Sequence, residues 1–440
     1  MSARVTCVFL AGLALACSKE EPKPEATPAP PAPVVQEAPK PEQTVLPRQG
    51  KAPKWALALA LSRFEGAKPQ PARLELVAQR DGTWSSVSFD DPDSNVFHKG
   101  LGMQYQGETP RIVTLGGMKA AIKSWSSKAE GFQSSTLWTE DFGGKFSRMR
   151  DAEMGDIDGD GRVDIAVGTH DQGIVAYLKR VLTPDGKPSD KWDVVKLDKI
   201  PNTFIHEIEL GDLDKDGALE IYATPSEPNK LDAGEQSGQV VRYVPKLKQG
   251  RKVVADLGKR HAKEILVKDV DGDGTDELYV AVEALTKGDR DNVEIVEPVE
   301  IRRYDAKTAP TGGKVVARIQ DRYCRFLTSG DIDGDGKKEM VAAAFRSGVW
   351  LLRPGADASQ EWTIENIDTD SSGFEHAALL TDLDGDGTDE LYVAADDQGE
   401  LRRYVWKDGK PVRETILKRD NPRETWTWNI TSVFGELTGL

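Results

Sequence analysis

Short apolar runs separated by turn residues dominate the sequence from Lys51 to its end. The runs are about five to eight residues long and rich in Val, Ile, Leu, Tyr and Trp, with Gly, Asp, Asn and Pro between them. The 3.6-residue periodicity of an amphipathic helix is almost absent from this region. Apolar runs of this length, bounded by turn residues, are typical of β-strands. The pattern therefore predicts an all-β fold.

Four such runs recur in a fixed order around a series of acidic loops. The first aspartates of these loops return about every 50–60 residues. They are Asp156, Asp212, Asp269, Asp331 and Asp382. In the last repeat, the run 377–380 leads into the loop, 391–394 leaves it and 400–404 follows, while 362–365 is the fourth run of the repeat before. Four short antiparallel strands per repeat are typical of a β-propeller blade.

Two further, degenerate repeats precede the acidic ones. Residues 111–115 and 121–125 align with the second and third strands of a blade whose loop, 103–111, carries no Asp. The other repeat fits three runs, at 55–61, 74–78 and 84–89. At the far end, 430–437 resembles a first strand with nothing after it, as ring closure requires, because an open ring would expose sheet edges. We expect about seven four-stranded blades, although six or eight also fit the pattern.

Composition is compatible with a folded body that does not bind nucleic acid. The chain is 38% hydrophobic and has 10 Trp, enough for a substantial core. Its formal net charge of −15 argues against a nucleic-acid partner, because neutralising phosphates requires basic patches. Cys7 and Cys17 lie in the N-terminal leader, so no disulfide is expected in the body. Cys324 is expected to be a half-buried strand residue, since no histidine lies beside it in the sequence to activate it.

The N-terminal region divides into a signal and a tether. Residues 1–16 read as an export signal, because Arg4 precedes an apolar run, 8–16, that is too short to span a membrane. Residues 18–50 are rich in Pro, Glu, Lys and Ala, a composition that cannot form a packed core and favours an extended tether. The propeller is therefore expected to occupy residues 51–440, with its five acidic repeats at about 150–420.

Residues 13–17 resemble the lipobox of bacterial lipoproteins, with Ala14 where Leu is usual. The resemblance implies that Cys17 is lipidated, so that the membrane is contacted only through this anchor. By the same resemblance, Ser18 after the cysteine implies the outer membrane, at its periplasmic face or at the cell surface. The alternative is an ordinary signal peptide cleaved near Ala16.

Each acidic loop has the spacing of a calcium-binding turn. Calcium prefers six to eight oxygen ligands. Carboxylates at positions 1, 3, 5 and 9 of a tight loop can converge on one point, glycine at position 6 permits the turn, and the carbonyl of position 7 adds a ligand. The predicted ligands, at positions 1, 3, 5, 7 and 9 of the successive loops, are Asp156, Asp158, Asp160, Arg162 and Asp164; Asp212, Asp214, Asp216, Ala218 and Glu220; Asp269, Asp271, Asp273, Thr275 and Glu277; Asp331, Asp333, Asp335, Lys337 and Glu339; and Asp382, Asp384, Asp386, Thr388 and Glu390. We expect up to five calcium ions, with a structural role.

An EF-hand shares the first half of this pattern but needs a carboxylate at position 12, on a helix. Position 12 is apolar in all five loops. Its residues are Val167, Ala223, Val280, Ala342 and Val393. The EF-hand interpretation is therefore rejected, and the loops are predicted to be turns between the first and second strands of a blade.

Loops of the form Asp-x-Asp-x-Asp-Gly-x-x-Asp/Glu followed by an apolar strand resemble the FG-GAP/VCBS repeat family, to which integrin α-subunit propellers belong. The resemblance covers about residues 97–420 and is clearest in five repeats. The Phe-Gly and Gly-Ala-Pro signatures of integrins are largely missing, so integrin-like ligand recognition is not implied. Similar repeats occur in bacterial surface proteins, lectin-like modules and some polysaccharide lyases.

A basic or potentially basic residue lies six positions before each loop. These residues are Arg150, His206, Lys263, Arg325 and His376. If the first strands line the central channel, the five side chains form a cationic ring at the end opposite the loops, where an acidic ligand could bind. Solvated strand ends or salt bridges between blades are the alternative. The insert 286–298 is read as a solvated turn, with a recognition loop as its alternative.

These observations predict a monomeric, non-catalytic module that binds a protein or a polysaccharide at the bacterial cell envelope. No metalloprotease His pair, phosphate-binding loop or nucleophile elbow is present. A polysaccharide-active enzyme of the lyase type, or a purely structural envelope component, are the alternatives.

Overall fold

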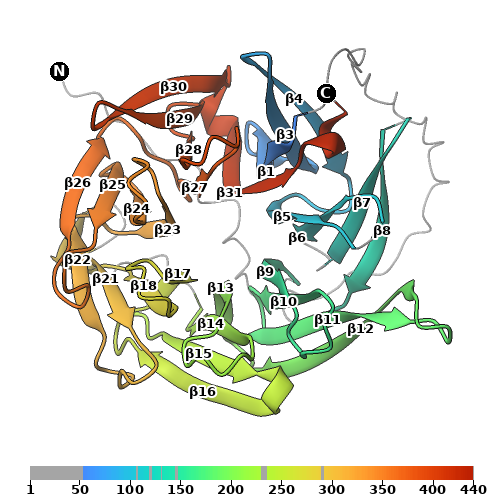
Figure 1. The fold of residues 1–440 in the computed structure, drawn as a ribbon, viewed down its shortest axis with the longest axis horizontal. Helices are drawn as coiled ribbons and strands as arrows, with labels where there is room; N and C mark the ends of the chain where they lie inside the picture. The colour runs from blue at the N-terminus through green and yellow to red at the C-terminus, as the bar shows by residue number, and fades with distance from the viewer. Residues whose placement is uncertain are drawn as a thin grey trace, which may run out of the picture.

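The computed structural model describes residues 53–105, 108–117, 121–129, 131–143, 147–228, 235–288 and 292–439. These residues form seven four-stranded antiparallel sheets arranged as blades around a central axis (Figure 1). The all-β, seven-bladed propeller predicted from the repeat pattern is therefore confirmed. The predicted export signal (1–16), the lipidated Cys17 and the tether (18–50) lie outside the described residues.

The blades follow one another in chain order, and we number them from the N-terminal end. Blade 1 contains β31 (Thr425–Phe434), β1 (Trp55–Glu65), β3 (Ala72–Arg80) and β4 (Thr83–Asp91), with β2 (Lys68–Pro69) paired to β1. Blade 2 contains β5 (Phe97–Met103), β6 (Arg111–Gly116), β7 (Ala121–Lys128) and β8 (Gly131–Thr139). Blade 3 contains β9 (Met149–Gly155), β10 (Asp164–Thr169), β11 (Ile174–Leu182) and β12 (Pro188–Lys199).

The remaining blades repeat this order. Blade 4 contains β13 (Phe204–Gly211), β14 (Glu220–Ser226), β15 (Gln239–Val244) and β16 (Gln249–Asp256). Blade 5 contains β17 (Ala262–Lys268), β18 (Glu277–Val282), β21 (Val299–Tyr304) and β22 (Lys314–Ile319). Blade 6 contains β23 (Cys324–Gly330), β24 (Glu339–Ala344), β25 (Val349–Arg353) and β26 (Thr363–Asp368), and blade 7 contains β27 (Ala378–Thr381), β28 (Glu390–Ala395), β29 (Glu400–Lys407) and β30 (Lys410–Lys418).

The two ends of the described chain close the ring in blade 1. β31, which follows blade 7 in the sequence, supplies the innermost strand and pairs antiparallel with β1, with Trp55 opposite Phe434 and Leu59 opposite Ile430. The first strands of neighbouring blades contact one another all the way round the axis, including β27 with β31 and β31 with β5. The stray strand predicted at 430–437 is therefore the strand that completes the ring, and it begins earlier, at Thr425.

The core lies between the blades. Every residue of the second strands β10, β14, β18, β24 and β28 is buried. These strands lie between two others in their own sheet and face neighbouring blades on both sides, which explains why they read as continuous apolar runs rather than alternating ones. The hydrophobic clusters that form this core join adjacent blades. In one of them, Val113 and Ile122 of blade 2 pack with Ile165 of blade 3. The outermost strand β12, by contrast, is mostly exposed or half-buried.

Other features complete the described structure. The insert predicted as a solvated turn contains a two-stranded hairpin, β19 (Leu285–Gly288) and β20 (Val293–Glu297). Short 3₁₀ helices occur at η2 (Pro245–Leu247), η3 (Pro422–Glu424) and η4 (Gly435–Thr438). Among the described residues, no helix has the length and apolarity needed to cross a membrane. Cys324 is fully buried in β23, whereas the sequence predicted half-burial, because this inner strand packs between two blades.

Candidate metal loops and the central channel

Five acidic loops join the first and second strands of blades 3 to 7. We name them loop 1 (156–164), loop 2 (212–220), loop 3 (269–277), loop 4 (331–339) and loop 5 (382–390). In each loop three carboxylates bring oxygen atoms within 4.8 Å of one another. These groups are Asp156, Asp158 and Asp164; Asp212, Asp214 and Asp216; Asp269, Asp271 and Asp273; Asp331, Asp333 and Glu339; and Asp382, Asp384 and Glu390. Positions 1 and 3 are thus present in every group, and the third member is position 5 or position 9.

The loops are built by their own carboxylates. In loop 1, Asp156 accepts a hydrogen bond from the backbone N–H of Gly161 at 2.9 Å, and Asp160 accepts one from Arg162 at 3.0 Å. The same two bonds, from position 6 to position 1 and from position 7 to position 5, occur in all five loops. Gly161 has a φ of +83°, which only glycine adopts without strain. The turn is therefore held in shape by hydrogen bonds from the backbone to the carboxylates of positions 1 and 5.

The position 9 carboxylates are the most buried members. Asp164 and Glu339 accept hydrogen bonds from the backbone N–H of position 2, at 3.2 and 3.3 Å. Burial raises the pKa of Asp164 to about 7, and repulsion from Asp158 adds to the effect. Burial likewise raises the pKa of Glu339 to about 7, with a contribution from Asp333. Without a bound cation, the clustered carboxylates of these loops repel one another, and the surrounding groups do not fully compensate for this repulsion.

A basic residue of the third strand lies against every loop. Arg303 donates to Asp271 at 3.1 Å and to Glu277 at 2.9 Å, and Lys179 donates to Asp158 at 2.9 Å. The full set is Lys179, Arg242, Arg303, Arg353 and Arg403. Sequence reasoning missed these residues because their distance from the loop along the chain varies. The available signal was a basic residue in each third strand, placed opposite position 9 or position 11 of its loop.

Three loops add a tyrosine at position 11. The hydroxyl of Tyr279 donates to Glu277 at 3.1 Å and that of Tyr392 to Glu390 at 3.1 Å, while Tyr222 donates to Glu220. The tyrosine points to the same face as position 9, because alternate residues of a strand share a face. It therefore fixes the orientation of the carboxylate next to the cluster.

Neighbouring loops are also connected. The side chain of Asp276, at position 8 of loop 3, accepts a hydrogen bond from the backbone N–H of Asp212, the first residue of loop 2, at 3.2 Å. Asp389 of loop 5 does the same for Asp331 of loop 4 at 2.9 Å, and Lys338 of loop 4 donates to the carbonyl of Asp269 at 2.7 Å. Position 8 thus joins each of these loops to the one before it.

The donor set fits a divalent cation that prefers oxygen ligands. Among the described side chains, Asp156 Oδ1, Asp158 Oδ1 and Asp269 Oδ1 are buried oxygen atoms without a hydrogen-bond partner. A buried carboxylate oxygen with no partner is costly, and a hard cation would satisfy it. The predicted position 7 carbonyls belong to residues that flank these groups, and their ligation stays a prediction.

Comparison with known families bears on these repeats. The FG-GAP-like repeat family matches residues 134–223 and 331–393. The matched segments contain loops 1, 2, 4 and 5. The protein is a β-propeller with FG-GAP-like repeats. The resemblance inferred from the acidic loops is therefore confirmed, and loop 3, outside the matched segments, has the same hydrogen-bond pattern as the others.

Two solved bacterial structures are similar to this propeller in fold. A provisionally assigned 6-phosphogluconolactonase from Bacteroides fragilis NCTC 9343 has a TM-score of 0.49 at 13% identity, covering 86% of this chain and 98% of that one. A second, from Bacteroides uniformis ATCC 8492, has a TM-score of 0.48 at 14% identity, covering 86% of this chain and 99% of that one. No curated protein sequence gives a significant match. The likeness of the two structures concerns the fold alone.

The end of the FG-GAP-repeat propeller opposite the loops contains the predicted cationic residues. All five are buried: Arg150, His206, Lys263, Arg325 and His376. Arg150 of blade 3 and Arg325 of blade 6 both contact Glu375, which precedes blade 7, at 3.4 and 3.1 Å. Arg325 also contacts Glu283 at 3.1 Å. Glu375 therefore bridges blades that lie across the axis from one another, and the acidic partner of these arginines belongs to the protein itself.

The other members of the predicted ring have different environments. Burial lowers the pKa of Lys263 to about 7, with a contribution from nearby Arg325. His376 has its Nδ1 2.6 Å from the carbonyl of Ala344 and its Nε2 2.7 Å from the hydroxyl of Ser371. Because a carbonyl only accepts, Nδ1 donates. Burial lowers the pKa of His376 to about 4, so near neutral pH the ring is neutral and Nε2 accepts from the Ser371 hydroxyl. The ring is thus a network of buried groups rather than a set of solvated strand ends.

Glu375→Gln is expected to lower the free energy of unfolding by about 2 kcal/mol, because it leaves two buried arginines without their shared anion. Urea denaturation of the variant and the parent protein measures the difference. Glu65→Gln replaces an exposed carboxylate on the same end of the propeller and is expected to leave stability unchanged. Equal stability of all three proteins would contradict the bridging role of Glu375.

Proposed function

We propose that this protein is a calcium-stabilised, non-catalytic module that binds a protein or a polysaccharide at the bacterial cell envelope. The observation that carries the proposal is the set of five preorganised loops, each with three carboxylates whose oxygen atoms lie within 4.8 Å of one another. In loops 1 and 3, a buried aspartate oxygen also has no hydrogen-bond partner among the described residues. The predicted export signal and the predicted lipid anchor at Cys17 support a location at the outer membrane.

Calcium would be held by the clustered carboxylates of positions 1 and 3, together with position 5 or 9. When bound, the ion neutralises carboxylates that otherwise repel one another. The loop residues then hold the first two strands of blades 3 to 7 in register, and the position 8 side chains of loops 3 and 5 connect each of these loops to the one before it. The binding surface is thereby kept rigid, which reduces the ordering cost of recognition.

The first test uses the full-length protein as bait in envelope extract, with free calcium and with chelator. We expect a defined partner to be retained in calcium and released by chelator, because loss of loop order loosens the ring. Retention that ignores the chelator would argue against a calcium-stabilised binding module. Release of unsaturated uronide products from pectic polysaccharide would instead support the lyase alternative.

Arg303→Gln is expected to raise the calcium affinity of loop 3 by about three- to tenfold, because the guanidinium repels a cation held by the same carboxylates. Isothermal titration calorimetry measures the change. The matched control is Arg302→Gln, since Arg302 is next in the strand but pairs with Glu300 instead. Weaker calcium binding in Arg303→Gln would mean that the arginine chiefly positions the two carboxylates.

A further inference from the structure

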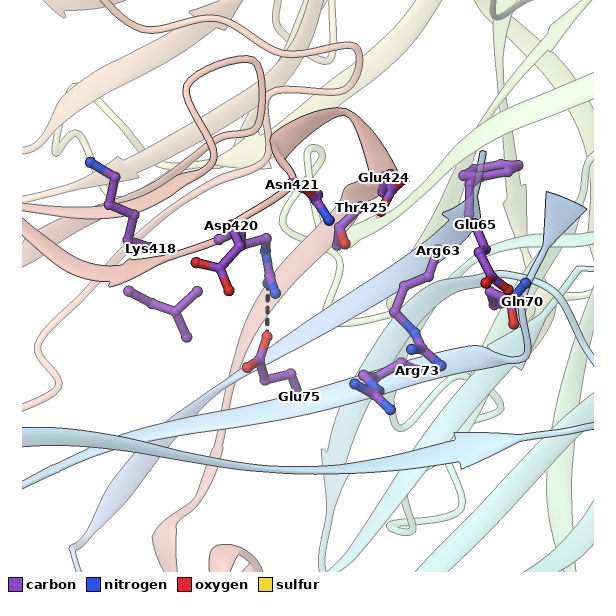
Figure 2. A pocket seen from close by; sticks show the side chains of 13 residues that line it. Arg63, Glu65, Gln70, Arg73, Glu75, Lys418, Asp420, Asn421, Glu424 and Thr425 are labelled. Carbon is purple, nitrogen blue, oxygen red and sulfur yellow. Dashed lines mark hydrogen bonds and ion pairs between the residues drawn. The ribbon is translucent and has the colours of Figure 1, made fainter. Parts of the chain in front are cut away.

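A cavity of about 510 Å³ lies where blade 7 meets blade 1 (Figure 2). One wall is the end of β1 and the turn into β3, from Arg63 to Glu75, and the other is the connection from β30 to β31, from Leu417 to Thr425. We call it the junction pocket. The acidic loops connect first to second strands, whereas this pocket is formed by the turn from the second to the third strand of blade 1 and by the connection from the fourth strand of blade 7 to β31. The junction pocket therefore lies on the end of the propeller opposite the loops.

Three arginines form the floor of the junction pocket. Arg63 and Arg73 share the carboxylate of Asp90, at 2.9 and 2.7 Å, and Arg419 pairs with Glu75 at 2.7 Å. Figure 2 shows the guanidinium ends of Arg63 and Arg73 close together, facing the same space. Their side chains are 22% and 33% exposed, so both are fixed yet reachable from solvent.

Arg63 and Arg73 present two positive charges to a single carboxylate, that of Asp90. Arg419 is paired with Glu75, and the rest of the lining carries Lys418 and the carboxylates of Glu65, Asp420 and Glu424. Each guanidinium has five N–H donors. Burial and the neighbouring Arg73 lower the pKa of Arg63 from its usual value. Within the described residues, Nε of Arg63 is buried without a hydrogen-bond partner. The pair formed by Arg63 and Arg73 therefore retains N–H donors for one additional anion.

The rim of the junction pocket is polar and adjoins a band of aromatic rings. Gln70, Asn421 and Thr425 offer amide and hydroxyl groups, and Phe64 is half-buried beside them. The ring of Phe64 lies 5.3 Å from that of Trp426. From Trp426 the band continues to the channel mouth through Phe374, at 5.6 Å between ring centroids, and Arg325 stacks 5.1 Å from Phe374.

We propose that the junction pocket binds the carboxylate of an acidic oligosaccharide through Arg63 and Arg73, while neighbouring sugar units lie on the aromatic band. This inference rests on the proposed binding function and narrows its ligand class. Arginine pairs bidentately with carboxylates, and the pocket has the volume of a small-ligand site. Half-exposed aromatic rings next to hydrogen-bonding groups suit the apolar faces and hydroxyls of sugars. An acidic peptide fits less well, because only Phe64 and Leu417 of the lining are apolar.

The experiment measures binding of the full-length protein, in excess calcium, to tetrasaccharides of galacturonate and of mannuronate. Each is compared with its carboxyl-reduced form, which keeps the sugar and removes the charge. A glutamate-rich peptide is the third probe. We expect at least one acidic tetrasaccharide to bind and its reduced form to bind at least about tenfold more weakly. Equal affinity for the charged and reduced forms, binding of the peptide alone, or no binding to any probe would each overturn the inference.

Variants then locate the site. Arg63→Gln combined with Arg73→Gln is expected to weaken binding about tenfold or more. Gln70→Glu, a nearly isosteric change at the rim, should weaken it by repulsion without touching the blade core. The control, Arg318→Gln, removes an ion-paired arginine that is 50% exposed on the outer strand of blade 5, and should bind normally. Unchanged binding in both pocket variants, with unchanged melting temperatures, would overturn the inference.

Failure here and failure of the proposed function are distinguishable. If acidic tetrasaccharides do not bind but a partner is still retained from envelope extract in a calcium-dependent manner, the junction pocket assignment is wrong and the binding module stands. If calcium changes neither stability nor retention, the proposed function itself fails.

Discussion

Removing calcium with a chelator is expected to lower the free energy of unfolding by about 2–7 kcal/mol. Extracellular calcium modules bind with dissociation constants of about 10⁻⁴–10⁻³ M, so free calcium at one to ten times that value stabilises each site by about 0.4–1.4 kcal/mol. Five independent loops give the total. It is comparable with the whole stability of a typical domain, about 5–15 kcal/mol.

Chemical denaturation with saturating calcium and with chelator measures this loss. Asp331→Asn removes the first carboxylate of loop 4 and is expected to reduce the calcium-dependent part by about one fifth, or somewhat more because Asp389 connects loops 4 and 5. The control is Asp408→Asn, which replaces an aspartate in the turn between β29 and β30, outside the metal loops. Identical stability with and without calcium would contradict the metal assignment.

From pH 6.5 to 4, the five histidines are expected to lower the free energy of unfolding, because four of them are buried and the fifth, His170, is half-buried. These residues are His98, His170, His206, His261 and His376. Burial lowers the pKa of each, to about 4 for His170 and for His376. Between that value and about 6.5, each of these histidines binds a proton in the unfolded chain but not in the folded chain, so its contribution to stability falls as the pH falls. Carboxylates with raised pKa values, such as Asp164 and Glu339, contribute in the opposite direction. Each of these two histidines contributes about 3 kcal/mol to the loss.

Urea denaturation at a series of pH values measures this slope. Chelator is present throughout, so that pH-dependent calcium binding does not contribute to it. The informative variant is His376→Asn, because His376 has a φ of +58° and asparagine tolerates that conformation. Its stability should depend less steeply on pH, by up to one proton. Equal pH dependence of stability in the parent protein and in His376→Asn would contradict the prediction. The cationic neighbours Arg150, Lys263 and Arg325 strengthen the expected effect, because they oppose protonation of His206.

The acidic loops show how much of a site can be predicted from residues that are close together in the sequence. Positions 1, 3 and 5 and the glycine at position 6 lie within one turn, so their spacing alone predicts that the carboxylates converge. Apolar Val167 and its counterparts at position 12 place a strand after each loop, and the strands of blade 3 confirm it. The basic side chains of the third strands were not predictable in this way, because a turn of variable length separates them from the loop. Only the register of the sheet places Arg303 beside Glu277.

The sequence by itself determined the repeat, the all-β blades, the position of the metal loops and the strand that closes the ring, because each depends on residues close together in the chain. Only the tertiary structure placed Glu375 between Arg150 and Arg325, and only it brought Arg63 and Arg419 into one pocket. These residues are far apart in the sequence, and their meeting depends on blade number and closure register. No local preference specifies either quantity. The acidic loops can therefore be predicted from the sequence, whereas the junction pocket forms only once the ring has closed.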